Sequence, residues 1–121
     1  MFSSPRLRYQ ADFENERRWL SLDLLHGRVG RDHPLYRHLR GAGIGESTLL
    51  ALRDEPCPSD VIGVNYYVTS DRYLDDRRER YPASCHGGNG RDSYADVEAV
   101  RARPRGIAGH HAVLAEAWAR R

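Results

Sequence analysis

The chain has 121 residues, which is room for one domain. All nineteen basic residues are arginine and seventeen residues are acidic, so the net charge of +2 gives no reason to expect nucleic-acid binding. No apolar run approaches the roughly 18 residues of a membrane span, and the N-terminus lacks an apolar signal region. We therefore expect a cytoplasmic protein without a membrane partner.

The first part of the chain predicts two helices. Residues 7–25 carry apolar side chains that recur near one helical face, and Gly27 follows as the expected stop. Asp32 as N-cap and Pro34 in the first turn then predict a short helix that ends at Gly41.

A glycine-rich turn follows at residues 41–45, from Gly41 to Gly45. It superficially resembles a phosphate-binding loop, but Arg40 stands where that loop needs its first glycine and Glu46 stands where it needs lysine. The same stretch also resembles a helix-hairpin-helix turn. We favour a simple glycine-rich turn that leads into a helix capped by its own polar residues.

The middle of the chain predicts one helix and one strand. Residues 46–54 are expected to be helical and to end before Pro56. Residues 61–68 are β-branched and aromatic and form the clearest strand in the sequence. One side of that strand is apolar and the other is semi-polar, which suits a parallel sheet between helices.

The last part of the chain is interpreted mainly as connection and helix. Residues 69–95 read as a long polar connection, and residues 95–103 do not decide between helix and strand. Pro104 and Gly106 are expected to break whatever precedes them. Residues 109–120 carry an apolar stripe at helical spacing.

One strand cannot form a parallel sheet, so its partners are expected to lie outside this chain. We therefore expect an α/β segment that is incomplete at both ends. It is expected to associate with the missing strands or with itself, because unpaired strand edges invite association.

The two cysteines predict no metal centre or disulfide. Cys57 and Cys85 are 28 residues apart in a chain of 121 and belong to no CxxC pair. His110 and His111 are adjacent, so on a helix they point in different directions and cannot share one ion as an i, i+4 pair would. We expect no metal and no cofactor.

Asn65 and Tyr67 are the candidate binding residues. They are two positions apart near the C-terminal end of the expected strand, so they point to the same side. An amide and a phenol both donate and accept hydrogen bonds, which suits polyhydroxylated ligands. A buried polar pair satisfied by backbone groups is the alternative interpretation.

Residues 61–70 read V-I-G-V-N-Y-Y-V-T-S and resemble the sixth barrel strand of family 1 glycoside hydrolases, which usually reads D-F-I-G-x-N-Y-Y-T-S. A bacterial family 1-like subgroup, often fused to a dTDP-4-dehydrorhamnose reductase-like module, is more similar. The segments that resemble it are residues 13–20, 81–82, 86–91 and 94–101. The resemblance implies a partial (β/α)8 (TIM) barrel segment over residues 1–121, with one barrel strand at 61–68.

The resemblance also implies roles and absences. Asn65 would hydrogen-bond a sugar hydroxyl, and Tyr67 would hydrogen-bond the nucleophile carboxylate. The family's acid/base motif Asn-Glu-Pro and its Thr-Glu nucleophile segment are both missing from this sequence. We therefore expect a glycosidase-like fragment that is inactive alone, and we assign no catalytic residue to it. The alternative is a small binding or regulatory module that uses the turn from Gly41 to Gly45.

Overall fold

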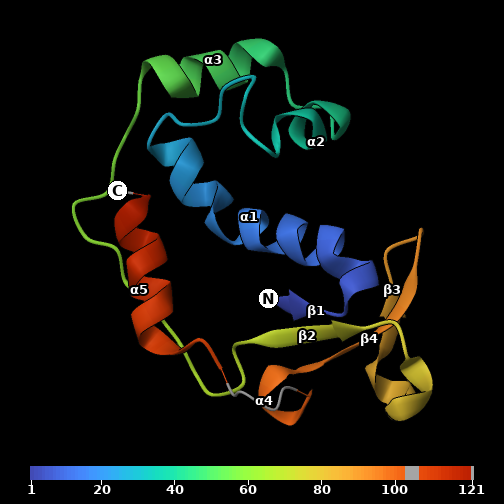
Figure 1. The fold of residues 1–121 in the computed structure, drawn as a ribbon. Helices are drawn as coiled ribbons and strands as arrows, with labels where there is room; N and C mark the ends of the chain where they lie inside the picture. Colours follow the sequence, from blue (N-terminus) through green and yellow to red (C-terminus); the bar gives the residue numbers. More distant parts are fainter. Residues whose placement is uncertain (103–106, 121) are drawn as a thin grey trace. The chain divides into compact units, whose positions relative to one another are not determined.

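The computed structural model describes residues 1–102 and 107–120 (Figure 1). The helices and strands are, in chain order, β1 (Phe2–Ser3), α1 (Arg8–Leu25), α2 (Tyr36–Gly41), α3 (Glu46–Asp54), β2 (Arg72–Asp75), β3 (His86–Gly88), β4 (Ser93–Glu98), α4 (Ala99–Ala102) and α5 (Gly109–Ala119). Short 3-10 helices lie at Pro5–Leu7, Arg78–Arg80 and Ala83–Cys85. None of the described helices has the length and apolar character that crossing a membrane requires.

The described residues form two compact units, and the division falls inside α1 and inside α5. Unit 1 comprises the described residues of Met1–Glu14 and Val64–Val113, and it contains the sheet. Unit 2 comprises the described residues of Asn15–Gly63 and Leu114–Arg121, and it contains α2 and α3.

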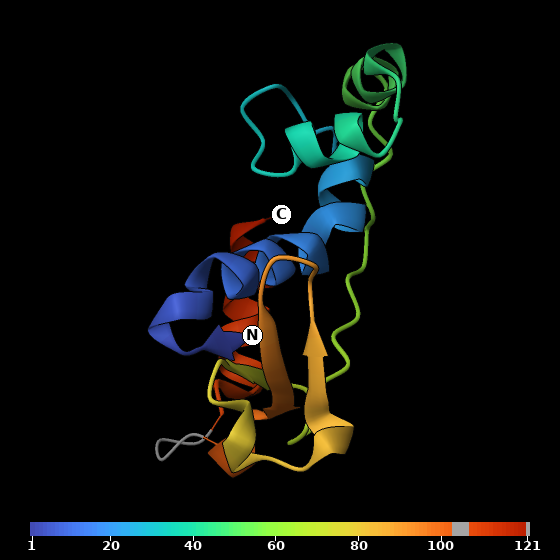
Figure 2. The same ribbon diagram turned by 90° about the vertical axis from the view of Figure 1, so that its right-hand side faces the viewer.

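The sheet of unit 1 has four strands in the order β1-β2-β4-β3. β1 is parallel to β2, whereas β2 and β3 are both antiparallel to β4. Figure 2 shows β3 and β4 as a hairpin. Its turn forms because the Asn89 side chain accepts the backbone N–H groups of Arg91 and Asp92, at 3.0 and 2.8 Å, and because Gly90 takes a φ of 85°.

A small apolar cluster packs on this sheet. In the β2–β4 register Leu74 lies opposite Asp96, so Leu74 and Tyr94 share one face. Leu7 packs against both from the 3-10 helix Pro5–Leu7, and Met1 adds a partly buried side chain. Leu7 and Leu74 are fully or almost fully buried, at 0% and 2% exposure.

Unit 2 begins with the C-terminal end of α1, which closes in a Schellman motif. The Arg28 N–H donates to the Asp23 carbonyl at 2.8 Å, and the Gly27 N–H donates to the Leu24 carbonyl at 3.1 Å. Gly27 supplies the left-handed backbone at φ 67°. The main buried apolar side chains of unit 2 are Trp19, Val29, Leu35 and Leu49.

Three expected helices are confirmed, because α1, α3 and α5 lie where residues 7–25, 46–54 and 109–120 predict them. The expected start of the short second helix is wrong. It begins at Tyr36 with Leu35 as N-cap, and Asp32 and Pro34 remain in the preceding turn. Pro104 and Gly106, which were expected to be helix or strand breakers, lie outside the described residues.

The expectation of a partial (β/α)8 barrel segment with a barrel strand at 61–68 is wrong. The sheet is mixed rather than parallel, and its main strands, β2 and β4, come from residues expected to be connection or undecided. Residues 61–68 contain no strand. The sheet combines a local hairpin, β3–β4, with a pairing between distant segments, Phe2–Ser3 and Arg72–Asp75.

Residues 61–68 are called the unpaired segment below, because no described strand pairs with them. Their side chains alternate from 61 to 67 between exposed and half-buried, as they do in an extended chain. A β-branched composition favours extension, but a strand also needs a neighbouring backbone to complete its hydrogen bonds. Composition alone therefore overstated the strand.

Replacing Gly27 tests the Schellman end of α1. A Cβ there meets the Arg53 carbonyl oxygen at 2.9 Å, and the φ of 67° is strained for other residues. We expect Gly27→Ala to lower the free energy of unfolding by about 1–2 kcal/mol in urea titrations. Gly41→Ala is the control, because a Cβ at the end of α2 meets nothing within 4 Å. Equal effects of the two substitutions would contradict the role of Gly27.

Candidate functional site

Asn65 and Tyr67 both lie on the exposed side of the unpaired segment. Tyr67 is 64% exposed, and its backbone N–H donates to Ser70 Oγ at 2.8 Å. Neither residue lines a described cavity. The structure therefore leaves both candidate residues open to solvent.

Tyr66, between the two, is the anchored residue of the segment. Its hydroxyl donates to Asp71 Oδ2 at 2.6 Å and accepts the Gly109 N–H at 3.0 Å. Asp71 is 2% exposed and also accepts the Ala108 N–H at 2.9 Å. The Tyr66 ring lies 5.0 Å from the His110 ring. This polar cluster satisfies the N-terminus of α5, which sequence reasoning missed because it treated Tyr66 only as an apolar face residue.

The turn at residues 41–45 is exposed and ends beside a carboxylate. Arg40 donates to the Ile44 carbonyl within the turn. Glu46 accepts both Nε and Nη2 of Arg31, at 2.9 and 2.7 Å, and accepts the Tyr36 hydroxyl at 3.0 Å. The hydrogen bond from Arg31 and then that from Tyr36 lower the pKa of Glu46. An ionised carboxylate at this position disfavours a phosphate in the turn.

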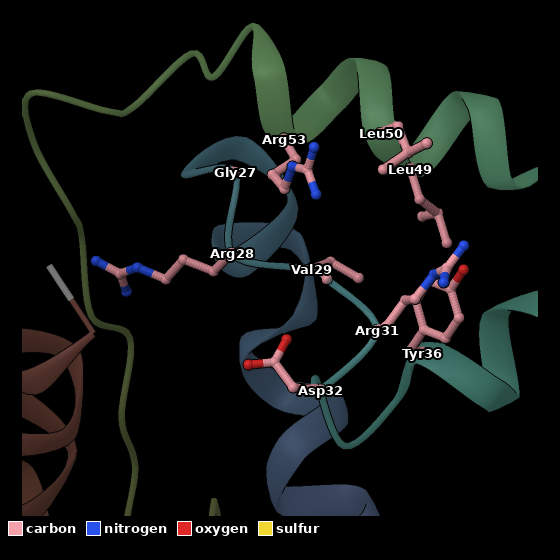
Figure 3. Close-up of a pocket in the computed structure, with 10 residues that line it drawn as sticks. Gly27, Arg28, Val29, Arg31, Asp32, Tyr36, Leu49, Leu50 and Arg53 are labelled. Atoms are coloured by element: carbon pink, nitrogen blue, oxygen red, sulfur yellow. The ribbon is translucent and has the colours of Figure 1, made fainter.

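A cavity of about 510 Å³ lies in unit 2 between α3 and the loop after α1 (Figure 3). Three arginines line it, and each is close to a carboxylate. Arg31 is paired with Glu46, and Arg53 donates to Asp54. Figure 3 shows the Arg31 guanidinium beside Tyr36, and Arg28 extending away from Val29. Arg28 is the most weakly paired of the three, because its Nη1 lies 3.9 Å from Asp23 Oδ1 and Asp23 also pairs with Arg120.

Glu16, Asp23 and His33 place three possible metal-ligand atoms within 4.8 Å of one another in unit 2. Arg120 already supplies a cation there. Its Nη1 lies 2.6 Å from Asp23 Oδ2, and its Nη2 lies 2.9 Å from Glu16 Oε2. The two carboxylates are thus neutralised by a guanidinium of the same chain.

The tautomer of His33 also disfavours a metal ion. Its Nδ1 accepts the Leu35 N–H at 3.1 Å, so the proton of the neutral ring is on Nε2. That Nε2–H donates to Asp23 Oδ2 at 3.3 Å. A metal at Nε2 would displace this proton to Nδ1. A protonated Nδ1 could no longer accept the hydrogen bond from the Leu35 N–H. We interpret the cluster as a structural ion-pair network.

A second cavity, of about 530 Å³, lies in unit 1 and is called the sheet cavity. It is formed by strands β2 and β4, the segment after β2 and helix α4. The lining residues are Arg72, Arg80, Tyr81, Pro82, Cys85, Asp96, Val97, Glu98 and Arg101. Its volume falls in the range of small-molecule sites.

A buried carboxylate holds one wall residue of the sheet cavity in place. Asp75 is fully buried and accepts Nε of Arg77 at 2.9 Å and the Tyr81 hydroxyl at 2.9 Å. Burial raises the pKa of Asp75, but the bonds from Arg77 and Tyr81 outweigh burial, so the net pKa is lowered. The bond from Tyr81 holds that ring in place at the wall of the cavity.

Glycoside hydrolysis needs a carboxyl whose pKa is raised so that it can act as an acid. The pKa is lowered at Glu46, Asp75 and Asp92, in the last case by hydrogen bonds from Tyr9 and then from Arg6. These three carboxylates are structural anions. They are unsuited to proton donation near neutral pH.

Sequence reasoning missed the sheet cavity because it treated residues 69–95 as a connection. Two signals were present. The Gly-Gly-Asn-Gly stretch at 87–90 is typical of a hairpin turn, and S-Y-A-D-V-E at 93–98 alternates as a strand does. Together they predict the β3–β4 hairpin and place Asp96 and Glu98 on one face.

No protein-family model, curated protein or solved structure matches this chain. Function is therefore inferred from the residues of the chain and from their geometry.

Removing the Tyr81 hydroxyl tests the buried carboxylate of unit 1. We expect Tyr81→Phe to lower the free energy of unfolding by about 1–2 kcal/mol at pH 7, because a bond to an ionised group is lost. The lowered pKa of Asp75 means that this contribution is present above its unfolded pKa and is lost as the pH falls through its folded value. Urea titrations from pH 7 down to about pH 3 measure the difference. Tyr73→Phe is the control, because Tyr73 lies two residues before Asp75 in β2 and its hydroxyl forms no hydrogen bond among the described residues. The same loss in Tyr73→Phe would contradict the assignment.

Removing Arg120 tests the ion-pair network of unit 2. Arg120→Ala leaves Asp23 buried with only His33 and the more distant Arg28 beside it. We expect a loss of about 2–4 kcal/mol in the free energy of unfolding. This is less than for a fully buried ion pair, because the Arg120 side chain keeps 26% of its surface exposed. Arg37→Ala, at an exposed position of α2, is the control. An Arg120→Ala chain as stable as the control would show that the network contributes nothing.

Proposed function

We propose that this chain is part of a family 1 glycosidase-like carbohydrate protein and does not hydrolyse glycosides by itself. The observation that carries the proposal is the unpaired segment. Its composition is that of a strand, its ladder is not completed by any described residue, and Asn65 and Tyr67 share its exposed side. The proposal concerns sugar handling and requires no barrel within this chain.

The same observation supports a partner of defined chemistry. The backbone groups of residues 61–65 form no described backbone hydrogen bond, so they are open to ladder hydrogen bonds from a strand outside the described residues. That strand comes from further glycosidase-like sequence or from a second copy of the chain. Asn65 and Tyr67 would then face a sugar beside the completed ladder, each able to donate and accept a hydrogen bond.

Two further features agree with this proposal. Cys57 and Cys85 are both free thiols, which fits a reducing compartment such as the cytoplasm. The three carboxyls with lowered pKa values, Glu46, Asp75 and Asp92, are unsuited to the acid role that glycoside hydrolysis needs.

Hydrolysis of 4-nitrophenyl β-glycosides by the purified chain tests the proposal. We expect release of nitrophenol no faster than in buffer, with no difference between the chain and its Tyr67→Phe variant, because two opposed carboxyls are needed. Activity that appears when the chain is extended by segments carrying Asn-Glu-Pro and Thr-Glu motifs supports the proposal. Turnover by the chain alone that falls in Tyr67→Phe would contradict it.

A further inference from the structure

The sheet cavity contains two internal ion pairs. Arg72 Nε lies 2.9 Å from Asp96 Oδ1, and its Nη2 donates to the Asp96 carbonyl at 3.0 Å. Arg101 Nε lies 2.5 Å from Glu98 Oε2. Each guanidinium is matched by one carboxylate, so these four side chains add no net charge.

Arg80 is the surplus cation of the cavity. It is exposed, and no carboxylate among the described residues forms an ion pair with its guanidinium. It belongs to the 3-10 helix Arg78–Arg80, directly before Tyr81. The cavity therefore carries one positive charge that the chain itself does not neutralise.

The remaining wall is mainly apolar. Tyr81, Pro82 and Val97 contribute a phenol ring, a pyrrolidine ring and an aliphatic side chain. Tyr81 is held by its bond to Asp75, so its ring loses little freedom when a ligand arrives. Rings of ligands pack well against such a wall, because aromatic faces bury large apolar area.

We propose that the sheet cavity binds a small organic monoanion made of a planar ring that carries one carboxylate. The carboxylate pairs with the Arg80 guanidinium, whose fork of N–H donors matches the two oxygens. The ring packs on Tyr81 and Pro82. Among the described residues Arg80 is the one cation of the cavity without a carboxylate partner, so a second negative charge on the ligand would have no cation to pair with.

Equilibrium dialysis against 4-nitrobenzoate tests this proposal, with 4-nitrobenzamide as a neutral ligand of nearly the same shape. We expect saturable binding of the anion at least about tenfold tighter than that of the amide, and weaker binding as salt is added. Arg80→Gln is expected to remove at least about fivefold of the affinity for the anion and to leave the amide unaffected.

Arg78→Gln is the matched control, because Arg78 is an exposed arginine of the same short helix that does not line the cavity. We expect it to bind 4-nitrobenzoate as the unchanged chain does. Circular dichroism of both variants establishes that each is folded. Equal loss in the two variants, or no saturable binding, would overturn the proposal.

Cys85 reports where the ligand lies, because its thiol lines the same cavity. In a Cys57→Ser chain it is the sole remaining cysteine of the sequence. We expect 4-nitrobenzoate to slow alkylation of Cys85 by iodoacetamide at least about threefold, and 4-nitrobenzamide to have no such effect at the same concentration. Saturable binding that leaves Cys85 fully reactive would place the ligand elsewhere and contradict the proposal.

Discussion

A carboxylate removed from water must be paired, and this constraint organises each unit of the chain. In unit 1 Asp75 is fully buried and gathers Arg77 and Tyr81 around it. In unit 2 Asp23 is 2% exposed and is held by Arg120 and His33. The Asp23 pair joins residues far apart in the chain, whereas the Asp75 pairs fix the stretch that directly follows β2.

The same constraint positions the features that bear on function. The Asp75 bond fixes Tyr81 at the wall of the sheet cavity, and the Asp71 bond fixes Tyr66 within the unpaired segment. With Tyr66 anchored, the alternation of the extended chain turns its neighbours Asn65 and Tyr67 to the exposed side. Buried carboxyl groups thus hold Tyr81 at the sheet cavity and Tyr66 between the two candidate binding residues.

The helices could be predicted from the sequence because apolar spacing and local stop signals depend on neighbours along the chain. Residues 46–54 and Gly27 are examples. The sheet could not be predicted in the same way, because strand pairing joins distant segments. The β-branched and aromatic composition of residues 61–68 was also a stronger strand signal than the apolar–polar alternation at 93–98. Arg120 is 97 residues from Asp23 and 104 residues from Glu16 in the sequence, so no local pattern indicates these ion pairs.

Residues 72–98 supply three of the four strands of the sheet, whereas the strand-like residues 61–68 form no ladder with a described strand. Amide hydrogen exchange measured residue by residue tests this most directly. We expect slow exchange in β2 and β4 and fast exchange at the amides of residues 62–65, which form no described backbone hydrogen bond. Protected amides at 62–65, together with fast exchange in β2 and β4, would contradict the account.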